Sequence, residues 1–529
     1  MPKKSTRLCS EPDHCHNRPT ILVILDGFGL GRKGDRGNAI TSETAPNIFS
    51  YMKKYSFTTL STGGVNVGLF PGQPGNSEAG HMNIGAGRVV KQDLVRISES
   101  IHDGTFFKNE AFKQALFHVK KYKTAVHILT MLTDGNSAHA YPEHLYAMLE
   151  YFRRQKQQKV FLHLITDGRD SSPYGARGFL HELRGHMLAH EKIATIGGRL
   201  YYMDRNKIWE RTRMAYDAMV LGRGDVANSA EEALARAYDS DNTDEFILPT
   251  VIFEDDKPVA TVGNNDAIFF VNARSDRARQ ITKTFVQADF EHHNSKTFHR
   301  KRVPKNIRFV AMTDFGPDLP GLFTAFPSPD IPNCLPKVIS DNYRQLYISE
   351  TEKYAHVTYF INGGFADPLN GEKREVVKSF PIKSYAEKPE MNSAALTKRV
   401  LRVIEKNEFD FICVNFPNAD MVGHTGDIVA ARKAVSVVDK AVAKIVEAAL
   451  KRDGQVLVIA DHGNADEMQN EKTGALLTEH SINKVPCVLA RRDSKKIHLH
   501  SGILSDVAPT LLELMHIQKP REMTGKTLF

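Results

Sequence analysis

Carboxylates and imidazoles follow several segments of this sequence that favour buried β-strands. In an open α/β sheet the carboxyl ends of the strands bind ligands, so side chains placed directly after them can converge on one site. Asp and His together favour Mn²⁺, Co²⁺ or Zn²⁺ over Ca²⁺. The sequence therefore predicts a site for divalent metal ions, whose candidate ligands are Asp26, Asp420, His424, Asp461, His462 and His480.

Two pairs within this set have a spacing that favours a shared ion. Asp420 and His424 are four residues apart and would lie on one face if that segment is helical. Asp461 and His462 are adjacent after a strand-like segment, where they could bind one ion or two. A single His is more often a structural or surface residue, so the prediction depends on the whole set.

Ser77 is the candidate nucleophile. It lies in the segment 75–81 (GNSEAGH), which we expect to be a Gly-rich loop that a charged ligand can approach closely. Two ions about 4 Å apart could clamp the attacking and leaving oxygens of a phosphoryl group, and one could lower the pKa of the Ser77 hydroxyl. The residues therefore predict two-metal phosphoryl transfer with a serine nucleophile, and either water or another hydroxyl could receive the phosphate.

A second charged group follows strand-like segments in the middle of the chain. Arg presents a rigid planar fork of donors that suits carboxylate and phosphate groups. Surface pairing with the neighbouring Asp residues is the alternative explanation. The segments 160–166, 194–196 and 267–271 lead to Arg169, Arg199, Arg205, Arg274 and Arg277, and this convergence predicts an anion-binding site.

The order of the expected elements predicts an α/β protein with more than one domain. The 529 residues exceed what one hydrophobic core usually serves. A second alternation of strands and helices begins near residue 125, with amphipathic helices expected at 143–153 and 211–221, and the alternation continues from about residue 327. Residues 1–18 are polar and contain Pro, so we expect a flexible extension there.

The composition favours a soluble globular protein, because 41% of the residues are hydrophobic and 25% are charged. No apolar run approaches the roughly 20 residues that span a bilayer, and we expect a cytoplasmic protein without a membrane partner. Five scattered cysteines fit a reducing compartment. The net charge of +8 is compatible with an anionic small substrate or with nucleic acid.

From about residue 20 to its end the sequence resembles the cofactor-independent phosphoglycerate mutases of the alkaline phosphatase superfamily. That family has a phosphatase-like domain interrupted by a transferase domain, which implies two α/β domains here, with boundaries at 1–91, 92–327 and 328–529. The matching segments are ILDGFG (24–29), GNSEAGHMNIGAGR (75–88), DGRD (167–170), GRLYYMDR (198–205), NARSDRARQ (272–280), TEKYAHVTYFINGG (351–364), KPEM (388–391), NADMVGHTGD (418–427) and ADHGNA (460–465).

The resemblance implies interconversion of 2- and 3-phosphoglycerate in glycolysis and gluconeogenesis without 2,3-bisphosphoglycerate. It implies a phosphoserine on Ser77, Asp170 as proton carrier and Lys353 near the phosphate. Two divalent ions, Mn²⁺ by preference with Mg²⁺ or Co²⁺ as alternatives, would be bound by Asp420, His424 and His480 and by Asp26, Ser77, Asp461 and His462. The substrate would contact His139, Arg169, Asp170, Arg199, Arg205, Arg274 and Arg277.

We expect a small-molecule substrate, no nucleic-acid partner and a monomer. His139 matches the family pattern GGVHSH only if one residue is inserted before it, and Ser275 stands where the family usually has Pro or Ala. A phosphatase or another mutase on the same scaffold is the first alternative, which the arginine-rich inserted domain would distinguish. A basic nucleic-acid-binding protein is the second, and it would show salt-sensitive binding to DNA of random sequence.

Overall fold

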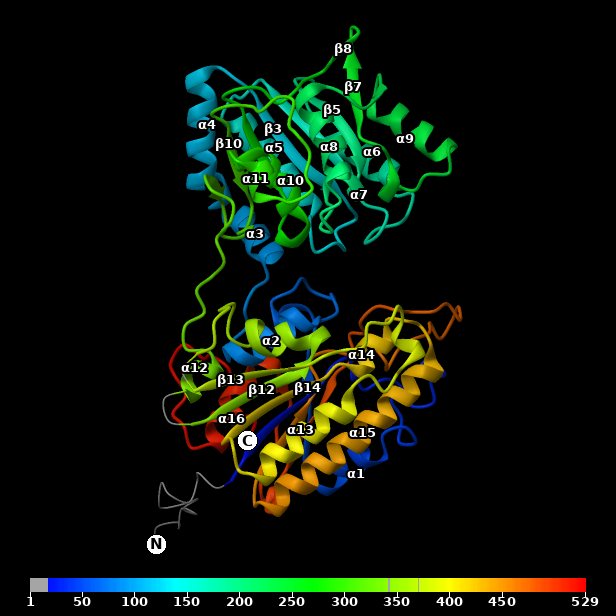
Figure 1. The fold of residues 1–529 in the computed structure, drawn as a ribbon, viewed down its shortest axis with the longest axis vertical. Helices are drawn as coiled ribbons and strands as arrows, with labels where there is room; N and C mark the ends of the chain where they lie inside the picture. The colour runs from blue at the N-terminus through cyan, green and yellow to red at the C-terminus, as the bar shows by residue number, and fades with distance from the viewer. Residues whose placement is uncertain (1–17, 341–342, 370) are drawn as a thin grey trace. The chain divides into compact units, whose positions relative to one another are not determined.

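The computed structural model describes residues 18–340, 343–369 and 371–529. The chain divides into two compact units, with Met1–Gln92 and Asp330–Phe529 in unit 1 and Asp93–Pro329 in unit 2. Each unit contains one large, mainly parallel sheet with helices packed against it (Figure 1), which confirms the expected class of two α/β domains. The extension expected at 1–18 lies outside the described residues except for Arg18. No helix in the described ranges is long and apolar enough to cross a membrane.

Unit 1 is organised around β1 (Thr20–Leu25), a fully buried strand near the centre of an eight-stranded sheet. β1 pairs in parallel with β14 (Phe411–Phe416) on one side and β15 (Gln455–Ile459) on the other. Short continuous apolar segments of this kind are typical of parallel strands covered on both faces. The strand order is β13 (Glu372–Val377), β12 (Gln345–Glu350), β14, β1, β15, β16 (Val485–Ala490), β2 (Ser56–Ser61) and β17 (Gly502–Ile503).

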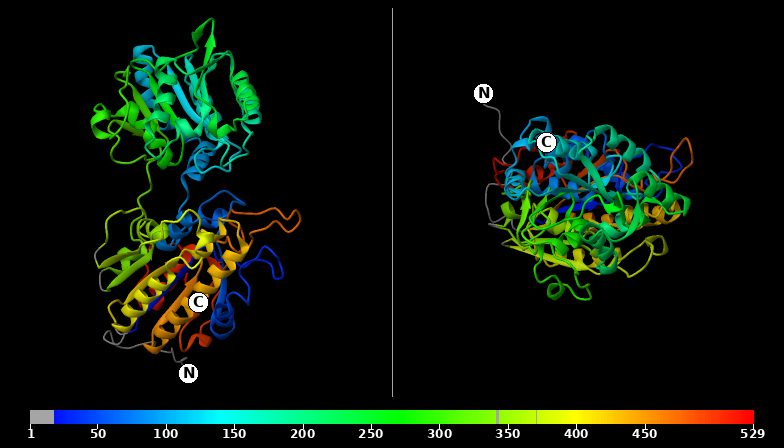
Figure 2. Two further views of the ribbon diagram at one scale, coloured as in Figure 1. Left: turned by 45° about the vertical axis from the view of Figure 1, so that its right-hand side comes forward. Right: turned by 90° about the horizontal axis from the view of Figure 1, so that it is seen from above.

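Only β16 runs antiparallel to its neighbours among the strands of this sheet that the structure describes. The long helix α15 (Ile428–Lys451) lies beside α13 (Ser393–Glu405) over one face of the sheet (Figure 2), and α1 (Pro46–Lys54) packs against α15. A second group of helices packs together in the same unit. It comprises α2 (Ser77–Ala86), α12 (Leu335–Ile339) and α16 (Val507–Leu514), and the short α14 (Asn418–Gly423) follows β14.

Unit 2 contains a second sheet in which six adjacent strands are parallel. The strand order is β11 (Leu322–Thr324), β10 (Arg308–Ala311), β9 (Ala267–Val271), β3 (Val126–Leu132), β4 (Val160–Thr166), β5 (Glu191–Gly198), β7 (Thr250–Glu254) and β6 (Asp225–Ala227), with β8 (Lys257–Pro258) beside β7. Its helices are α3 (Asp93–His102), α4 (Glu110–Tyr122), α5 (Pro142–Arg154), α6 (Ala176–His186), α7 (Arg199–Tyr202), α8 (Trp209–Leu221), α9 (Ala230–Asp239), α10 (Ser275–Val286) and α11 (Phe290–His293).

The sheet of unit 2 separates two hydrophobic cores. Along β3, Ile128 packs into the core that contains α4 and α5, whereas Leu129 and Met131 pack into the core that contains α8 and α10. Because successive side chains of a strand point to opposite faces, a strand buried on both faces must be apolar throughout. The expected helices at 143–153 and 211–221 correspond to α5 and α8.

Candidate functional site

Three neighbouring strands of unit 1 bring together the carboxylates of the candidate metal site. Asp26 follows β1, Asp461 follows β15, and Asp420 lies in α14 just beyond β14. All three side chains are buried. Gly27 has a φ of 73°, and a Cβ there would lie 2.6 Å from the Cα atom of Asp420, so only Gly permits this approach of the two backbones.

Ser77 is the first residue of α2, so the prediction of a Gly-rich loop at this position is wrong. The Asn76 side chain caps the helix by accepting a hydrogen bond from the Ala79 amide at 2.8 Å, and this local capping outweighs the flanking glycines. Gly80 instead allows the helix to approach Asp461 closely. A Cβ on residue 80 would lie only 3.0 Å from the Cβ of Asp461. Ser77 is therefore buried at the amino end of a helix, where the helix dipole favours negative charge.

The ammonium group of Lys353 lies at the centre of this carboxylate cluster. Lys353 follows β12 and donates hydrogen bonds from Nζ to Ser77 Oγ at 2.6 Å, to Asp26 Oδ1 at 2.8 Å and to Asp420 Oδ2 at 2.6 Å. Burial alone would lower the pKa of Lys353, but the carboxylates of Asp26, Asp420 and Asp461 raise it above its usual value. The side chain is therefore a buried cation that directly contacts the candidate nucleophile.

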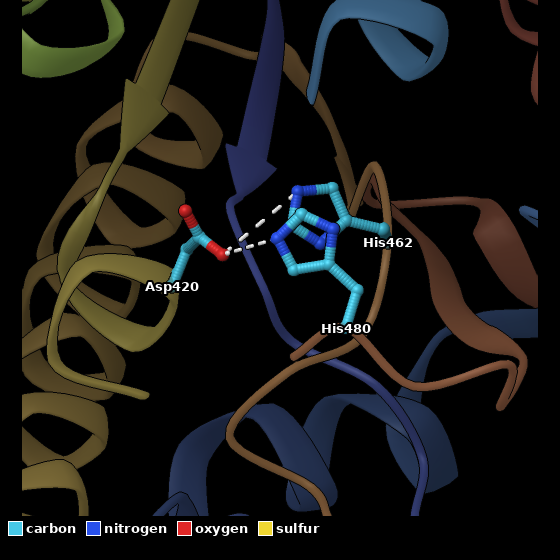
Figure 3. Close-up of side chains that lie close together, drawn as sticks. All are labelled: Asp420, His462 and His480. Carbon is cyan, nitrogen blue, oxygen red and sulfur yellow. Dashed lines mark ion pairs between the residues drawn. The ribbon is translucent and has the colours of Figure 1, made fainter. Parts of the chain in front are cut away.

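One group of histidines lies around Asp420. Its Oδ1 atom is 3.3 Å from His424 Nε2 and 3.2 Å from His480 Nε2, and these two nitrogens are 3.2 Å apart. His462 Nε2 is 4.0 Å from the same oxygen. Figure 3 shows the imidazoles of His462 and His480 directed at the Asp420 carboxylate.

A second group of donor atoms surrounds His462. Its Nε2 atom lies 2.9 Å from Ser77 Oγ, 3.4 Å from Asp26 Oδ1 and 3.5 Å from Asp461 Oδ2. Burial alone would lower the pKa of His462, but Asp461, Asp26 and Asp420 raise it to about 9. Asp461 Oδ2 is buried, and no hydrogen bond from the described residues reaches it.

The orientation of the three imidazoles suits metal coordination. The Nδ1 atoms of His424, His462 and His480 lie 2.6, 3.2 and 2.8 Å from the main-chain carbonyls of Thr478, Gly463 and Gly75, respectively. A carbonyl oxygen can only accept, so Nδ1 carries a proton in each ring, and Nε2, which faces the carboxylates, is the nitrogen that can bind a cation once it is deprotonated. Together with three buried carboxylates, one of which has an oxygen that accepts no hydrogen bond from the described residues, these imidazoles fit divalent ions of the Mn²⁺, Co²⁺ and Zn²⁺ type.

His81 is a nearby titratable residue that sequence reasoning did not select. It is fully buried in α2, and one of its nitrogens lies within 4.8 Å of a carboxylate oxygen of Asp26 and of Asp461. Ligand atoms of Asp420, His462 and His480 form a second group, in which they lie within 4.8 Å of one another. His81 does not follow a strand, which was the criterion that selected most of the other residues. Its separation of four residues from Ser77 along one helix was the available signal.

The cationic residues predicted in the middle of the chain lie together in unit 2. They follow β4, β5 and β9, which are parallel strands of the same sheet. Arg199 is 2% exposed and contacts Asp167 and, at 2.8 Å, Asp170. Arg205 and Arg274 both contact Asp276, at 2.6 and 3.1 Å.

The remaining two arginines belong to the same cluster. Arg169 lies 3.5 Å from Glu245. The pKa of Arg277 is lowered, mainly by burial and to a smaller extent by the positive charges of Arg199, Arg205 and Arg169. The cluster is therefore a set of concentrated guanidinium groups, of which several are oriented by carboxylates.

His139 also belongs to this cluster. Its Nδ1 atom lies 3.2 Å from Asn272 Oδ1, and burial together with Arg199 and Arg274 lowers its pKa to about 4. The preceding Ser137 donates a hydrogen bond to Asp170 Oδ2 at 2.8 Å. Asp167, Ser137, Asn272, Asp276 and Glu245 are the polar neighbours that sequence reasoning did not propose as site residues.

Comparisons with known proteins give matches over almost the whole chain. Residues 97–317 match the family model described as BPG-independent PGAM N-terminus, and residues 261–502 match Type I phosphodiesterase / nucleotide pyrophosphatase. The chain is 43% identical to the 2,3-bisphosphoglycerate-independent phosphoglycerate mutase of Clostridium acetobutylicum, over 97% of this chain and 99% of that protein.

Two further matches extend this similarity. The protein of the same name from Moorella thermoacetica is 45% identical, over 97% of this chain and 98% of its own length. A crystal structure of Leishmania mexicana phosphoglycerate mutase at low cobalt concentration matches with a TM-score of 0.75 and 29% identity. That match covers 97% of this chain and 98% of the other.

Proposed function

The chain belongs to the family of 2,3-bisphosphoglycerate-independent phosphoglycerate mutases, and from this premise we propose that it interconverts 2- and 3-phosphoglycerate through a phosphoserine at Ser77. The observation that carries the proposal is the environment of Ser77 Oγ, which lies 2.6 Å from Lys353 Nζ and 2.9 Å from His462 Nε2. A buried ammonium group and a helix amino end both stabilise the negative charge of a phosphoryl group.

The proposed reaction has two transfers. In the first, the Ser77 hydroxyl loses its proton as Oγ attacks the phosphorus atom, the bond from phosphorus to the glycerate oxygen breaks, and that oxygen gains a proton. In the second, the other glycerate hydroxyl loses its proton as it attacks the phosphoserine, and Ser77 Oγ leaves and regains a proton. Asp170 is the proposed proton carrier. Burial alone would raise the pKa of Asp170, but its partners Arg199 and Ser137 lower it. The carboxyl therefore stays ionised and oriented, which supports this role.

We propose two divalent ions as cofactors, Mn²⁺ by preference with Mg²⁺ or Co²⁺ as alternatives. The short distances within each donor group support a division into Asp420, His424 and His480 for one ion and Asp26, Ser77, Asp461 and His462 for the other. When bound, such ions neutralise phosphoryl oxygens and lower the pKa of a coordinated hydroxyl. The remaining contribution of the chain is to orient Ser77 and to place Lys353 beside it.

The guanidinium cluster of unit 2 is the proposed binding site for the carboxylate and phosphate groups of phosphoglycerate. Its members would be His139, Arg169, Asp170, Arg199, Arg205, Arg274 and Arg277, with Lys353 of unit 1 near the transferred phosphate. In this proposal the phosphatase-like domain comprises 1–91 and 328–529, and the transferase domain comprises 92–327. We further propose that the protein works as a monomer in the cytoplasm, in glycolysis and gluconeogenesis.

A coupled assay with 3-phosphoglycerate and no 2,3-bisphosphoglycerate tests this function. We expect metal-free protein to form 2-phosphoglycerate only after Mn²⁺ is added, and Ser77→Ala to form none. The matched control is Ser436→Ala, a half-buried serine of α15 that should retain full activity. Release of inorganic phosphate in place of 2-phosphoglycerate would instead identify a phosphatase.

A further inference from the structure

We propose that His81 and Asn415 form a positioning pair that holds the backbone of Ser77 against Asp26, and that His81 is not a metal ligand. The inference rests on the proposed role of Ser77 as the nucleophile. It concerns two residues on different elements, the helix α2 and the end of strand β14. Both side chains are fully buried.

The ring of His81 contacts a different group at each nitrogen. Its Nδ1 atom lies 2.9 Å from the main-chain oxygen of Ser77, one helical turn earlier, and 3.2 Å from Asp461 Oδ2. Its Nε2 atom lies 3.1 Å from Asn415 Nδ2. The same Asn415 nitrogen lies 2.8 Å from Asp26 Oδ2.

These contacts determine which nitrogen of His81 carries the proton. Asp26 is an ionised carboxylate paired with Lys353, so it can only accept, and the amide nitrogen of Asn415 must face it. The second hydrogen of that nitrogen then points to His81 Nε2, which must be an unprotonated acceptor. The Ser77 carbonyl also only accepts, so Nδ1 carries the ring proton.

His81 therefore has no nitrogen lone pair available for an ion. This distinguishes it from His424, His462 and His480, whose Nε2 atoms face the carboxylate cluster while Nδ1 contacts a main-chain carbonyl. The proximity of His81 to Asp26 and Asp461 alone would suggest a ligand. The hydrogen bonds assign it to the support of the ligands instead.

The pair connects the sheet to the nucleophile through hydrogen bonds that are buried throughout. Asp26, at the end of β1, accepts from Asn415, which donates to His81, which donates to the carbonyl of Ser77. Helix α2 is thereby held at a defined position relative to Asp26. Because a displacement of about 1 Å can cost roughly 100-fold in rate, losing the pair should affect turnover rather than substrate binding.

The position of the proton can be measured without altering the chain. In the metal-free protein labelled with ¹⁵N-histidine, a long-range ¹H–¹⁵N spectrum should show a protonated Nδ1 and an unprotonated Nε2 for His81. The signal is assigned by its absence in His81→Asn. A proton on Nε2, or on both nitrogens, would overturn the proposal whatever the activity of the variants.

Two variants separate positioning from a merely structural role. The Nδ2 atom of Asn can replace Nδ1 as the donor to Ser77, whereas Leu offers no donor. We expect His81→Leu to lower kcat about 100-fold with KM changed less than about twofold, and His81→Asn to recover kcat to within about tenfold of the parent. Equal losses in the two variants, or a loss mainly in KM, would contradict the proposal.

Calorimetric titration of the metal-free protein with Mn²⁺ gives a readout independent of turnover. Residues that support metal ligands typically affect metal affinity by about 10–100-fold, so His81→Leu should bind Mn²⁺ more weakly with the stoichiometry of the parent. Loss of one ion per chain would identify His81 as a ligand and refute the inference. If the parent protein has no mutase activity, the proposed function fails, while the NMR and calorimetric results still decide the role of His81.

Discussion

Replacing Lys353 by Met should strongly destabilise unit 1 in the metal-free protein. The Lys353 side chain is 6% exposed, and Nζ contacts the buried carboxylates of Asp26 at 2.8 Å and Asp420 at 2.6 Å. Met keeps an unbranched side chain of similar size but removes the only ammonium group in these contacts. Leaving buried carboxylates without their cation costs about 3–5 kcal/mol, so we expect a loss of that size in the free energy of unfolding of unit 1.

Divalent metal should restore part of this loss. An ion at 100 times its dissociation constant stabilises the folded state by about 2.7 kcal/mol. Without the ammonium group the carboxylates attract a cation more strongly, so Mn²⁺ should stabilise Lys353→Met more than it stabilises the parent. The same variant should lose most of its mutase activity, because the proposed phosphoryl group on Ser77 loses its adjacent cation.

Hydrogen exchange followed by mass spectrometry at increasing denaturant would measure this effect for each unit. Peptides from β1 and β14 report unit 1, and peptides from β3 and β4 report unit 2 as an internal reference. Lys433→Met is the matched control, because Lys433 is 61% exposed and its contact with Glu390 should contribute at most about 1 kcal/mol. A loss below about 1 kcal/mol in unit 1, or an equal loss in unit 2, would refute the reasoning.

Four other predictions test separate parts of the structure. Ser77→Ala should reduce mutase activity at least about 1,000-fold while costing only about 1 kcal/mol of stability, and near-parental turnover in the coupled assay would contradict it. Chelation with EDTA should abolish turnover and added Mn²⁺ should restore it, so full activity after exhaustive chelation would exclude the proposed metal requirement. Arg199→Lys should lower kcat/KM about 10–100-fold, because Nη1 of Arg199 contacts both Asp167 and Asp170 and Lys lacks the further guanidinium donors that Arg199 has beyond this nitrogen. The exposed Arg213→Lys should be neutral in the same assay. Burial lowers the pKa of His144 to about 3, so the folded protein binds a proton at this imidazole less readily than the unfolded chain does. The free energy of unfolding should therefore fall as the pH drops below about 6.5, by about 2 kcal/mol at pH 5. His144→Gln should flatten the dependence of denaturant midpoint on pH, whereas the exposed His181→Gln should leave it unchanged, and identical curves for both variants would disprove this origin.

Much of the fold was predictable because it depends on local patterns. The continuous apolar segments at 21–25, 411–415 and 455–460 correspond to β1, β14 and β15, since such segments favour parallel strands buried on both faces. Carboxylates directly after these strands could be proposed as neighbours, because the carboxyl ends of parallel strands meet at one edge of the sheet. The prediction of a Gly-rich loop around Ser77 was wrong because the capping of α2 by Asn76 outweighed the flanking glycines.

Residue type and strand patterning thus determined, from the sequence alone, the α/β class, the resemblance to the family and the side chains offered for metal and anion binding. Only the tertiary structure determined which atoms meet. The contacts of Lys353 with Asp26 and of Asn415 with His81 join residues 327 and 334 positions apart. Their distances depend on the order of the strands in the sheet and on the packing of α2 against the sheet edge, which no local segment specifies. The proton position on His81 follows from the same long-range contacts, because an imidazole has two nitrogens and only its neighbours in space decide which one donates.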